Sequence, residues 1–398
     1  MATLPVFDVI VVGGGLAGSA LAGVLARAGL DVLVVERETH FRDRIRGEFT
    51  WPWGVVDALR VGLDEVLQRA GRVELDAVEF YEDRQLVKTD PFEGTPMIGF
   101  LHPALQEELF TWAGSGGVTT LRPAKATGFA WNGGPTVTVA VDGREVEYTA
   151  RLVVGADGKL SAVRRWAGGE AAADPEHHRF GGVLVTGVAE RSVLSDASTP
   201  PASFFWFPPS AETMRLYFRM TAQRLRETHV DRSFASFLAY ATAFVPEGTL
   251  TGARQAGPLG FFPNNDVWAT RIAGDDVVLV GDAAGAVDPS WGFGTSLVFR
   301  DARELRDLLL AERDWAPAIA EFARRRWQYY EVVRAYDRWM NQIFAEEGPE
   351  ADHRRERHAL AREHDPTLGG FALLEAQGPD GLVPDESARR HFFGEDLA

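Results

Sequence analysis

The stretch FDVIVVGGGLAGSALAGVLARAGLDVLVVE, residues 7–36, decides the fold of this 398-residue chain. An apolar run leads into a glycine turn, a helical pattern, a second apolar run and an acidic residue. Within the turn, Gly13 permits a tight bend, Gly15 lets backbone approach a pyrophosphate, and Gly18 lets the helix press on the strand. The stretch therefore predicts a βαβ unit that binds a dinucleotide.

The residues around this turn predict the contacts with such a ligand. Leu16 and Ala17 stand where the N–H groups of a helix N-terminus point outward, which together with the helix dipole favours an anionic diphosphate. Glu36 is expected to accept hydrogen bonds from ribose hydroxyls, with Arg37 beside it as a further contact, and Gly29 is expected to end the helix. The unit does not distinguish NAD from FAD, because both contain the same ADP half.

The composition excludes several classes of function. Hydrophobic residues make up 45% of the chain and charged residues 25%, as in ordinary globular proteins. The net charge of −16 disfavours nucleic acids and anionic membrane surfaces as partners. The chain has no cysteine, which excludes disulfides and thiolate metal ligands, so redox chemistry needs a bound cofactor, and no metal site is predicted. Because no secretory signal or long apolar run is found, a cytoplasmic protein is expected.

Two later segments repeat the pattern of a buried strand that ends in a polar glycine turn. The first is RLVVGADG at residues 151–158, and the second is VVLVGDAAGAVDPSWGFG at residues 277–294. In a parallel sheet such turns face a ligand at the carboxyl ends of the strands.

The three motifs, GxGxxG at 13–18, GADG at 155–158 and GDAAGAVDPSWGFG at 281–294, together resemble one family. In order and spacing they are similar to the single-component, FAD-dependent (group A) monooxygenases of the para-hydroxybenzoate hydroxylase fold, from residue 5 to about residue 345. The resemblance implies FAD, with NADPH or NADH as a transient reductant, since no second GxGxxG unit is present for a nicotinamide domain. An enzyme that receives reduced flavin from a reductase partner fits the same pattern.

The resemblance implies an α/β fold with a Rossmann-like FAD-binding domain, an inserted and mainly antiparallel β substrate domain, and C-terminal helices. A long amphipathic helix is expected from Trp315 to about Phe344. A homodimer is considered as the assembly. The predicted boundaries are 1–75, 100–178 and 276–345 for the FAD-binding domain, 76–99 and 179–275 for the substrate domain, and 346–398 for a C-terminal helical extension.

The third motif is implied to surround the flavin ring. Asp282 would accept hydrogen bonds from the ribityl chain. Gly292 and Gly294, on either side of Phe293, would let backbone lie flush against the ring. Thr295 would start a helix whose positive N-terminal end faces the pyrimidine edge of the flavin and stabilises negative charge there.

The resemblance implies five further cofactor contacts. Pro289 would shape the dry space in which a C4a-hydroperoxyflavin survives. Asp157 and Gly158 would lie near the pyrophosphate, and Arg46 would bind phosphate oxygens or the ribityl chain. Gln106 is a weaker candidate for a flavin contact, in a helix expected over residues 103–113.

The chain also departs from the family pattern. Gly285 replaces the usual histidine, Thr295 and Ser296 replace an asparagine or aspartate, and Pro103 stands where members often carry arginine. The residues at these positions would contact the edge of the ring in the family pattern. The pattern RGExxxP at residues 46–52 resembles the epoxidising branch more than the phenol hydroxylases.

The predicted reaction is hydroxylation or epoxidation of a large, mostly apolar aromatic or alkene substrate in secondary metabolism. Arg215 and Arg219 are considered as anchors for a substrate carboxylate. No residue stands out as a catalytic acid or base, and Glu48 and Tyr217 are the two candidates to test. The candidate walls of the substrate pocket are aromatic: Phe205, Trp206, Phe207, Tyr217, Trp291 and Phe293.

Three alternatives remain open at this point. A flavin-dependent halogenase is disfavoured because the WxWxIP motif of that group is missing, Trp206 being followed by Phe207 and Pro208. A flavin-dependent reductase of isoprenoid-type double bonds fits residues 283–294 as well as a hydroxylase does. A non-catalytic nucleotide-binding module would have no need of contacts to a flavin ring.

Overall fold

The N-terminal stretch folds as its sequence predicts in the computed structural model, which describes residues 6–189, 191–199, 202–274 and 276–397. It forms β1 (Val6–Val12), α1 (Leu16–Arg27) and β2 (Val32–Val35), and β1 pairs in parallel with β2. Gly29 has a φ of +93° just after the helix, in the expected role of terminating residue. The predicted domain boundaries at residues 1, 275 and 398 lie outside the described residues.

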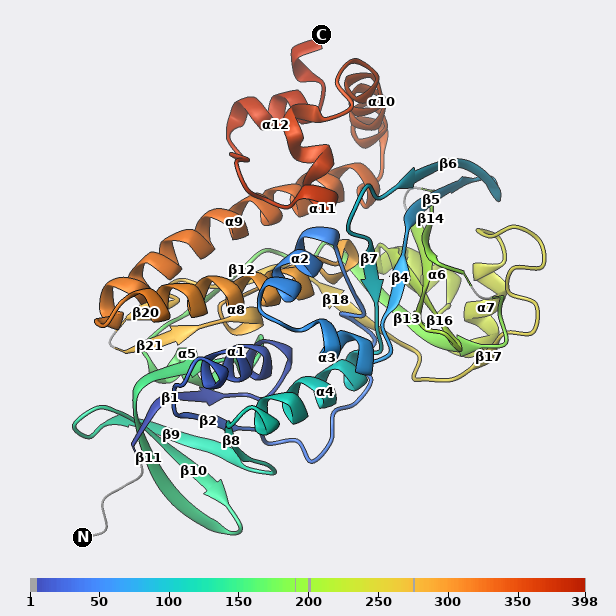
Figure 1. Ribbon diagram of the computed structural model, residues 1–398. Helices are drawn as coiled ribbons and strands as arrows, with labels where there is room; N and C mark the ends of the chain where they lie inside the picture. The colour runs from blue at the N-terminus through green and yellow to red at the C-terminus, as the bar shows by residue number, and fades with distance from the viewer. Residues whose placement is uncertain (1–5, 190, 200–201, 275, 398) are drawn as a thin grey trace.

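Figure 1 shows this βαβ unit within a larger parallel sheet of the order β21-β11-β1-β2-β8. The added strands are β21 (Val277–Leu279), β11 (Arg144–Gly155) and β8 (Thr119–Leu121), with β20 (Ala273–Gly274) antiparallel at one edge. The first half of β11 instead pairs antiparallel with β10 (Pro135–Val141), which pairs with β9 (Lys125–Trp131). The carboxyl ends of β1, β2, β11 and β21 therefore meet at one edge, where all three motifs lie.

Helices cover one face of this sheet and the β9–β11 meander covers the other. The helical side packs α1 with α4 (His102–Ser115), α8 (Phe293–Ala311) and the start of α9 (Trp315–Phe344) around Val9, Val11 and Phe299. The other side packs α5 (Ala162–Trp166) and the meander around Ile10 and Val153. Further helices on the first side are α2 (Pro52–Arg60) and α3 (Asp64–Arg69).

The second large sheet is almost entirely antiparallel and has the order β17-β13-β16-β15-β14-β5-β6, with β18 also paired to β13. One face of this sheet is turned toward the edge of the parallel sheet where the three motifs lie. The other face is covered by α6 (Ala222–Thr228) and α7 (Phe234–Ala241). The sheet comprises β5 (Ala77–Glu82), β6 (Gln85–Pro91), β13 (His178–Thr186), β14 (Val193–Thr199), β15 (Ala202–Ser210), β16 (Thr213–Met220), β17 (Arg254–Gln255) and β18 (Gly260–Asn264).

Two small sheets join these units. One has the order β3-β7-β4, formed by β3 (Phe49–Thr50), β7 (Met97–Gly99) and β4 (Val73–Leu75). The other has the order β12-β19-β22, formed by β12 (Ala171–Ala173), β19 (Val267–Ala269) and β22 (Gly285–Ala286).

The C-terminal helices pack against the far half of α9, at the top of Figure 1. Trp339 of α9 contacts Phe371 and Phe392 there, with ring centroids 4.8 and 5.3 Å apart. None of the helices in the described part of the chain combines the length and apolar character that crossing a bilayer requires. The C-terminal elements are α10 (Pro349–His364), a 3₁₀ segment (Leu368–Leu373), α11 (Leu374–Gln377), α12 (Glu386–Phe392) and a 3₁₀ turn (Glu395–Leu397).

Candidate functional site

A cavity of about 600 Å³ runs from the edge of the parallel sheet to the inner face of the antiparallel sheet. It is lined by the carboxyl ends of β1, β2 and β11 and by the segment that follows β21, which is the place where open α/β sheets bind ligands. Of the predicted cofactor contacts, all except Gly18 and Phe293 line this cavity. Those that do are Gly13, Gly15, Leu16, Ala17, Glu36, Arg37, Arg46, Gln106, Asp157, Gly158, Asp282, Pro289, Gly292, Gly294 and Thr295.

The glycine turn has the geometry that a bound diphosphate needs. Gly13 has a φ of +104°, and a Cβ atom there would lie 2.4 Å from the carbonyl oxygen of Ala156. A Cβ atom on Gly18 would lie 1.9 Å from the carbonyl oxygen of Gly13, so Gly18 acts in helix packing and not in lining. Gly15 is the N-cap of α1 and supplies no side chain to the first-turn N–H groups, which leaves them for an anion.

Glu36 is held rigidly at the end of β2. Its Oε2 accepts a hydrogen bond from the Gly14 N–H at 2.7 Å and its Oε1 accepts one from the Glu38 N–H at 2.7 Å. Each carboxylate oxygen keeps a second lone pair, so the fixed carboxylate can still accept hydrogen bonds from ribose hydroxyls in the cavity.

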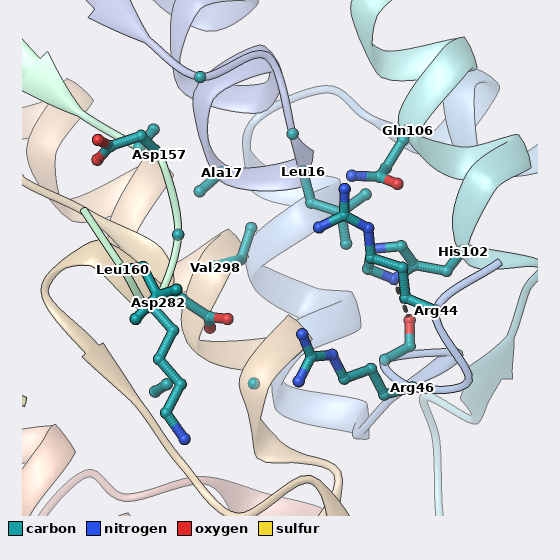
Figure 2. Close-up of a pocket in the computed structure, with 18 of the residues that line it drawn as sticks. Leu16, Ala17, Arg44, Arg46, His102, Gln106, Asp157, Leu160, Asp282 and Val298 are labelled. Carbon is teal, nitrogen blue, oxygen red and sulfur yellow. Dashed lines mark hydrogen bonds between the residues drawn. The ribbon is translucent and has the colours of Figure 1, made fainter. Parts of the chain in front are cut away.

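Asp157 has a structural task in addition to its place at the cavity. Its Oδ2 accepts hydrogen bonds from the N–H groups of Ala162 at 2.6 Å and Val163 at 3.2 Å, which caps the start of α5. Figure 2 shows its carboxylate turned away from Arg44 and Arg46. Backbone at Asp157 and Gly158 is therefore what this segment offers to a ligand.

Basic side chains face Asp282 across the cavity. Arg46 extends toward Asp282 in Figure 2, and Arg44, which the sequence did not single out, also lines the cavity. Lys159 also lines the cavity, and burial, followed by the charge of Arg46, lowers its pKa. These cations can neutralise a diphosphate in a protein of strongly negative net charge.

His102 fixes the loop that carries Arg46. Its Nδ1–H donates a hydrogen bond to the carbonyl oxygen of Gly47 at 2.6 Å, at a position where φ is +69°. Burial lowers the pKa of His102, so the neutral imidazole is favoured.

The start of α8 differs from the prediction by two residues. The helix begins at Phe293 and not at Thr295, because Gly292 with a φ of +72° is its N-cap. A Cβ atom on Gly292 would lie 2.0 Å from the Phe49 ring, whereas no atom lies within 4 Å of one on Gly294. The backbone at Gly294 thus opens on the cavity, as a flat ring requires.

Phe205 and Tyr217 line the inner end of the cavity together with Phe49 and Phe180, which the sequence analysis missed. The rings of Phe180 and Tyr217 stack with centroids 4.7 Å apart and an interplanar angle of 24°. Phe49 directly follows the RGE pattern and could have been found from it. Phe180 is brought in only by the pairing of β13 with β16.

The other predicted substrate walls lie away from the cavity. Trp206 points to the opposite face of β15, where it packs with Phe204 in the core that α7 covers. Successive residues of a strand alternate between the two faces of the sheet. Phe207 is fully buried against Phe49, and Phe293 is fully buried. Trp291 turns toward α9, where its Nε1–H donates a hydrogen bond to Asn341 Oδ1 at 3.2 Å.

Glu48 and Tyr217, the two weak catalytic candidates, are hydrogen-bonded to each other at the cavity wall. The Tyr217 O–H donates to Glu48 Oε2 at 2.8 Å, and Arg215 donates to both oxygens of Glu48 at 2.6 Å. Burial raises the pKa of the Glu48 carboxyl, against the opposing charge of Arg215. Burial, and then the charge of Glu48, raise the pKa of Tyr217 well above its usual value.

The two arginines considered as substrate anchors are already engaged inside the protein. Arg215 is fully buried and paired with Glu48 and with Asp43, at 2.8 Å from the Asp43 Oδ2. Arg219 donates a hydrogen bond to Ser203 at 2.6 Å and lies 4.1 Å from the centroid of the Trp291 ring. Neither side chain is part of the cavity lining.

Residues 6–318 match the family model described as FAD binding domain. The chain is 31% identical over 342 residues to 6-methylpretetramide 4-monooxygenase of Streptomyces rimosus, which covers 80% of each protein. It is 26% identical over 333 residues to the mitochondrial squalene epoxidase 2 of Arabidopsis thaliana, covering 76% of this chain and 54% of that protein. The chain thus spans about half the length of this second relative.

Solved structures share the fold at lower identity. PqsL of Pseudomonas aeruginosa, described as a probable FAD-dependent monooxygenase, aligns with a TM-score of 0.73 at 23% identity, over 86% of this chain and 97% of PqsL. Matched proteins also include reductases of digeranylgeranylglycerophospholipid and flavin-dependent halogenases.

Proposed function

Because this chain belongs to the FAD binding domain family and is an FAD-dependent oxidoreductase, we propose that it is a monooxygenase that uses NAD(P)H and O₂. The proposed substrate is a large, mostly apolar aromatic or alkene compound of secondary metabolism, which the enzyme hydroxylates or epoxidises. A homodimer, a reductase partner and a cytoplasmic location remain predictions from the sequence.

One observation carries the proposal: the cofactor motifs and an aromatic chamber share a single cavity. The glycine turn, Glu36 and Asp282 lie at one end, and Phe180 and Phe205 line the other. A ligand held by the motifs would therefore face an apolar surface of the antiparallel sheet, which suits a flat or extended hydrocarbon skeleton.

The residues present fit FAD in their chemistry. The Gly13–Gly18 turn and the free N–H groups of α1 would hold the diphosphate, and Glu36 the ribose. Asp282 and Arg46 would hold the linking chain, and the open backbone at Gly294 would face the ring. When bound and reduced, FAD would supply the electrons that activate O₂ for transfer of one oxygen atom to an electron-rich ring or double bond.

The chain's own side chains would orient the substrate and exclude water. The stacked rings of Phe180 and Tyr217 offer a flat wall for an aromatic or alkene skeleton. The Tyr217 O–H donates to Glu48 Oε2, so a hydroxyl on the substrate would meet the phenol oxygen and the carboxylate there as hydrogen-bond acceptors.

The first experiment is a visible spectrum of the purified protein, followed by anaerobic addition of NADH or NADPH and then admission of O₂. Flavin bands that bleach and return on aeration are the expected result, followed by oxygen-dependent turnover in a screen of aromatic and polyene natural products. Bound flavin that neither nicotinamide bleaches would indicate a reductase partner. A protein without affinity for FAD would refute the proposal.

The same experiment separates the alternatives. A reductase of isoprenoid-type double bonds, favoured by the relatives of that activity, would form product without O₂. A halogenase would form product only when chloride or bromide is present. An oxygenase needs O₂ and no halide.

A further inference from the structure

The segment Ala286–Gly292 forms one wall of the cavity, and a buried carboxylate lies directly behind it. Ala286, Val287, Pro289 and Gly292 line the cavity. Asp288, between them, points the other way and its side chain is fully buried. An ionised group in such a place is stable only when every lone pair is engaged.

Asp288 is engaged in this way by four other residues. Its Oδ1 accepts hydrogen bonds from the Ser290 N–H at 2.8 Å, from the Ser290 hydroxyl and from the Asn264 amide. Its Oδ2 accepts one from Asn341 Nδ2 at 3.0 Å and lies 3.3 Å from His178 Nε2. Although burial alone raises its pKa, the charge and hydrogen bond of His178 hold the pKa of Asp288 well below its usual range.

Asn341 of α9 ties this carboxylate to the far end of the same segment. Its Nδ2 donates to Asp288, and its Oδ1 accepts the hydrogen bond from Trp291 Nε1 at 3.2 Å. The carbonyl oxygen of Trp291 accepts a hydrogen bond from Trp51 Nε1 at 2.8 Å. The Asn341 amide therefore contacts the segment on both sides of Pro289. Asn341 itself lies on α9, outside the segment.

His178 links the network to the outer part of the protein. Its second ring nitrogen, Nδ1, lies 2.7 Å from Nδ1 of His177, which is partly buried. Within the described part of the chain, His177, His178 and Asp288 are the one cluster with the composition of a metal site. However, the two ring nitrogens of His178 contact different partners, His177 and Asp288, and the oxygens of Asp288 already accept from N–H and O–H donors. The cluster therefore links its residues by hydrogen bonds and does not form a chelating metal site.

We propose that Asp288 is a positioning residue whose carboxylate, through Asn341 and His178, fixes the shape of the Ala286–Gly292 wall. The hydrogen bonds pull the segment back from the cavity at Asp288 while leaving Pro289 and Gly292 on its surface. The consequence for turnover rests on the proposed function: a fixed wall keeps water from the reacting centre, and a loose wall diverts electrons from product to hydrogen peroxide.

The test is hydrogen–deuterium exchange of the full-length protein without added FAD, read by mass spectrometry on peptides that cover residues 285–294. Asp288→Asn removes the charge and sets an NH₂ group against the amides of Asn264 and Asn341. Exchange in this segment is expected to be at least tenfold faster, with peptides of β1 and β11 unchanged. Asp385→Asn, which alters an exposed helix cap on α12, is the matched control and should leave the segment as in the wild type.

The double variant Asp288→Asn with Asn341→Asp exchanges the carboxylate and the amide across their 3.0 Å contact. It restores a hydrogen bond between the two positions and an acceptor for Trp291, so exchange should return to within threefold of the wild type. If Asp288→Asn does not fold, Asn341→Ser is expected to loosen the same peptides. In the FAD-loaded enzyme, the peroxide yield should rise in the single variant and fall again in the double variant.

Several outcomes would overturn the proposal. Unchanged exchange at residues 285–294 in Asp288→Asn would show that the carboxylate does not hold the wall, and a double variant as fast as the single one would remove the role of Asn341. Protection of the segment by added Zn²⁺, lost in His178→Asn, would make the cluster a metal site instead. Because exchange is measured without FAD, failure here is distinct from failure of the oxygenase proposal.

Discussion

Replacing Arg215 by methionine would leave two carboxylates facing an apolar side chain inside the protein. Arg215 makes two hydrogen bonds of 2.6 Å to Glu48 and one of 2.8 Å to Asp43. Arg215 and Glu48 are fully buried, and the Asp43 side chain is 20% exposed, so water can solvate Asp43 but not Glu48. Removing one partner of such a buried pair costs about 3–5 kcal/mol, since a charge remains uncompensated.

The loss should depend on pH. Burial raises the pKa of Glu48, and without Arg215 only the hydrogen bond from Tyr217 opposes that rise. The folded variant then takes up a proton at Glu48 more readily than the unfolded chain does, so the penalty is present at pH 8 and shrinks as the pH falls toward 5. The assay is urea unfolding of Arg215→Met at both pH values, followed by far-ultraviolet circular dichroism.

The double variant Arg215→Met with Glu48→Gln is the decisive comparison. It removes the buried charge together with its partner and should recover most of the lost free energy of unfolding, since a neutral replacement of a buried ion pair is often tolerated. A cost below about 1 kcal/mol for Arg215→Met at pH 8, or a double variant as unstable as the single one, would refute this reasoning.

Three further predictions concern the cofactor site and the C-terminal helices. Gly292→Ala should lower FAD affinity at least tenfold and cost about 1–3 kcal/mol of stability, because φ is +72° and Phe49 fills the space. Gly294→Ala, with free space around it, should also lower FAD affinity but without loss of stability. Both affinities are measured by fluorescence titration with FAD, and equal destabilisation of both variants would contradict the geometry. Arg46→Ala should weaken FAD binding about tenfold at low salt and less in 0.5 M salt, unlike Arg42→Ala outside the cavity lining. Burial raises the pKa of Glu375 to about 7 from 4.5. The free energy of unfolding of the protein therefore falls as the pH rises through this range, because the buried carboxyl must ionise. Glu375→Gln should therefore stabilise the protein by about 1–3 kcal/mol at pH 8 and hardly at pH 5 in urea unfolding; a gain that does not change with pH would exclude titration of Glu375 as its cause.

The sequence alone was sufficient for the parallel sheet and its cofactor edge. Apolar runs of four to seven residues that end in glycine turns are local signals, because strand burial and positive φ are properties of neighbouring residues. The GxGxxG turn and the lining by Glu36 and Asp282 were therefore predictable, and the apolar period of residues 315–344 predicted the helix Trp315–Phe344. β14 and α6 do not end in such glycine turns and were not predicted.

Only the tertiary structure decided which side chains meet. Phe205 and Trp206 are adjacent and both aromatic, yet one lines the cavity and the other packs under α7, because strand register fixes alternate faces. Glu48 and Arg215 are 167 positions apart in the chain, and His178 and Ser290 are 112 apart. Partners at such separations are chosen by the packing of whole sheets and helices, so the sequence determined where the cofactor edge lies and the fold determined what faces it.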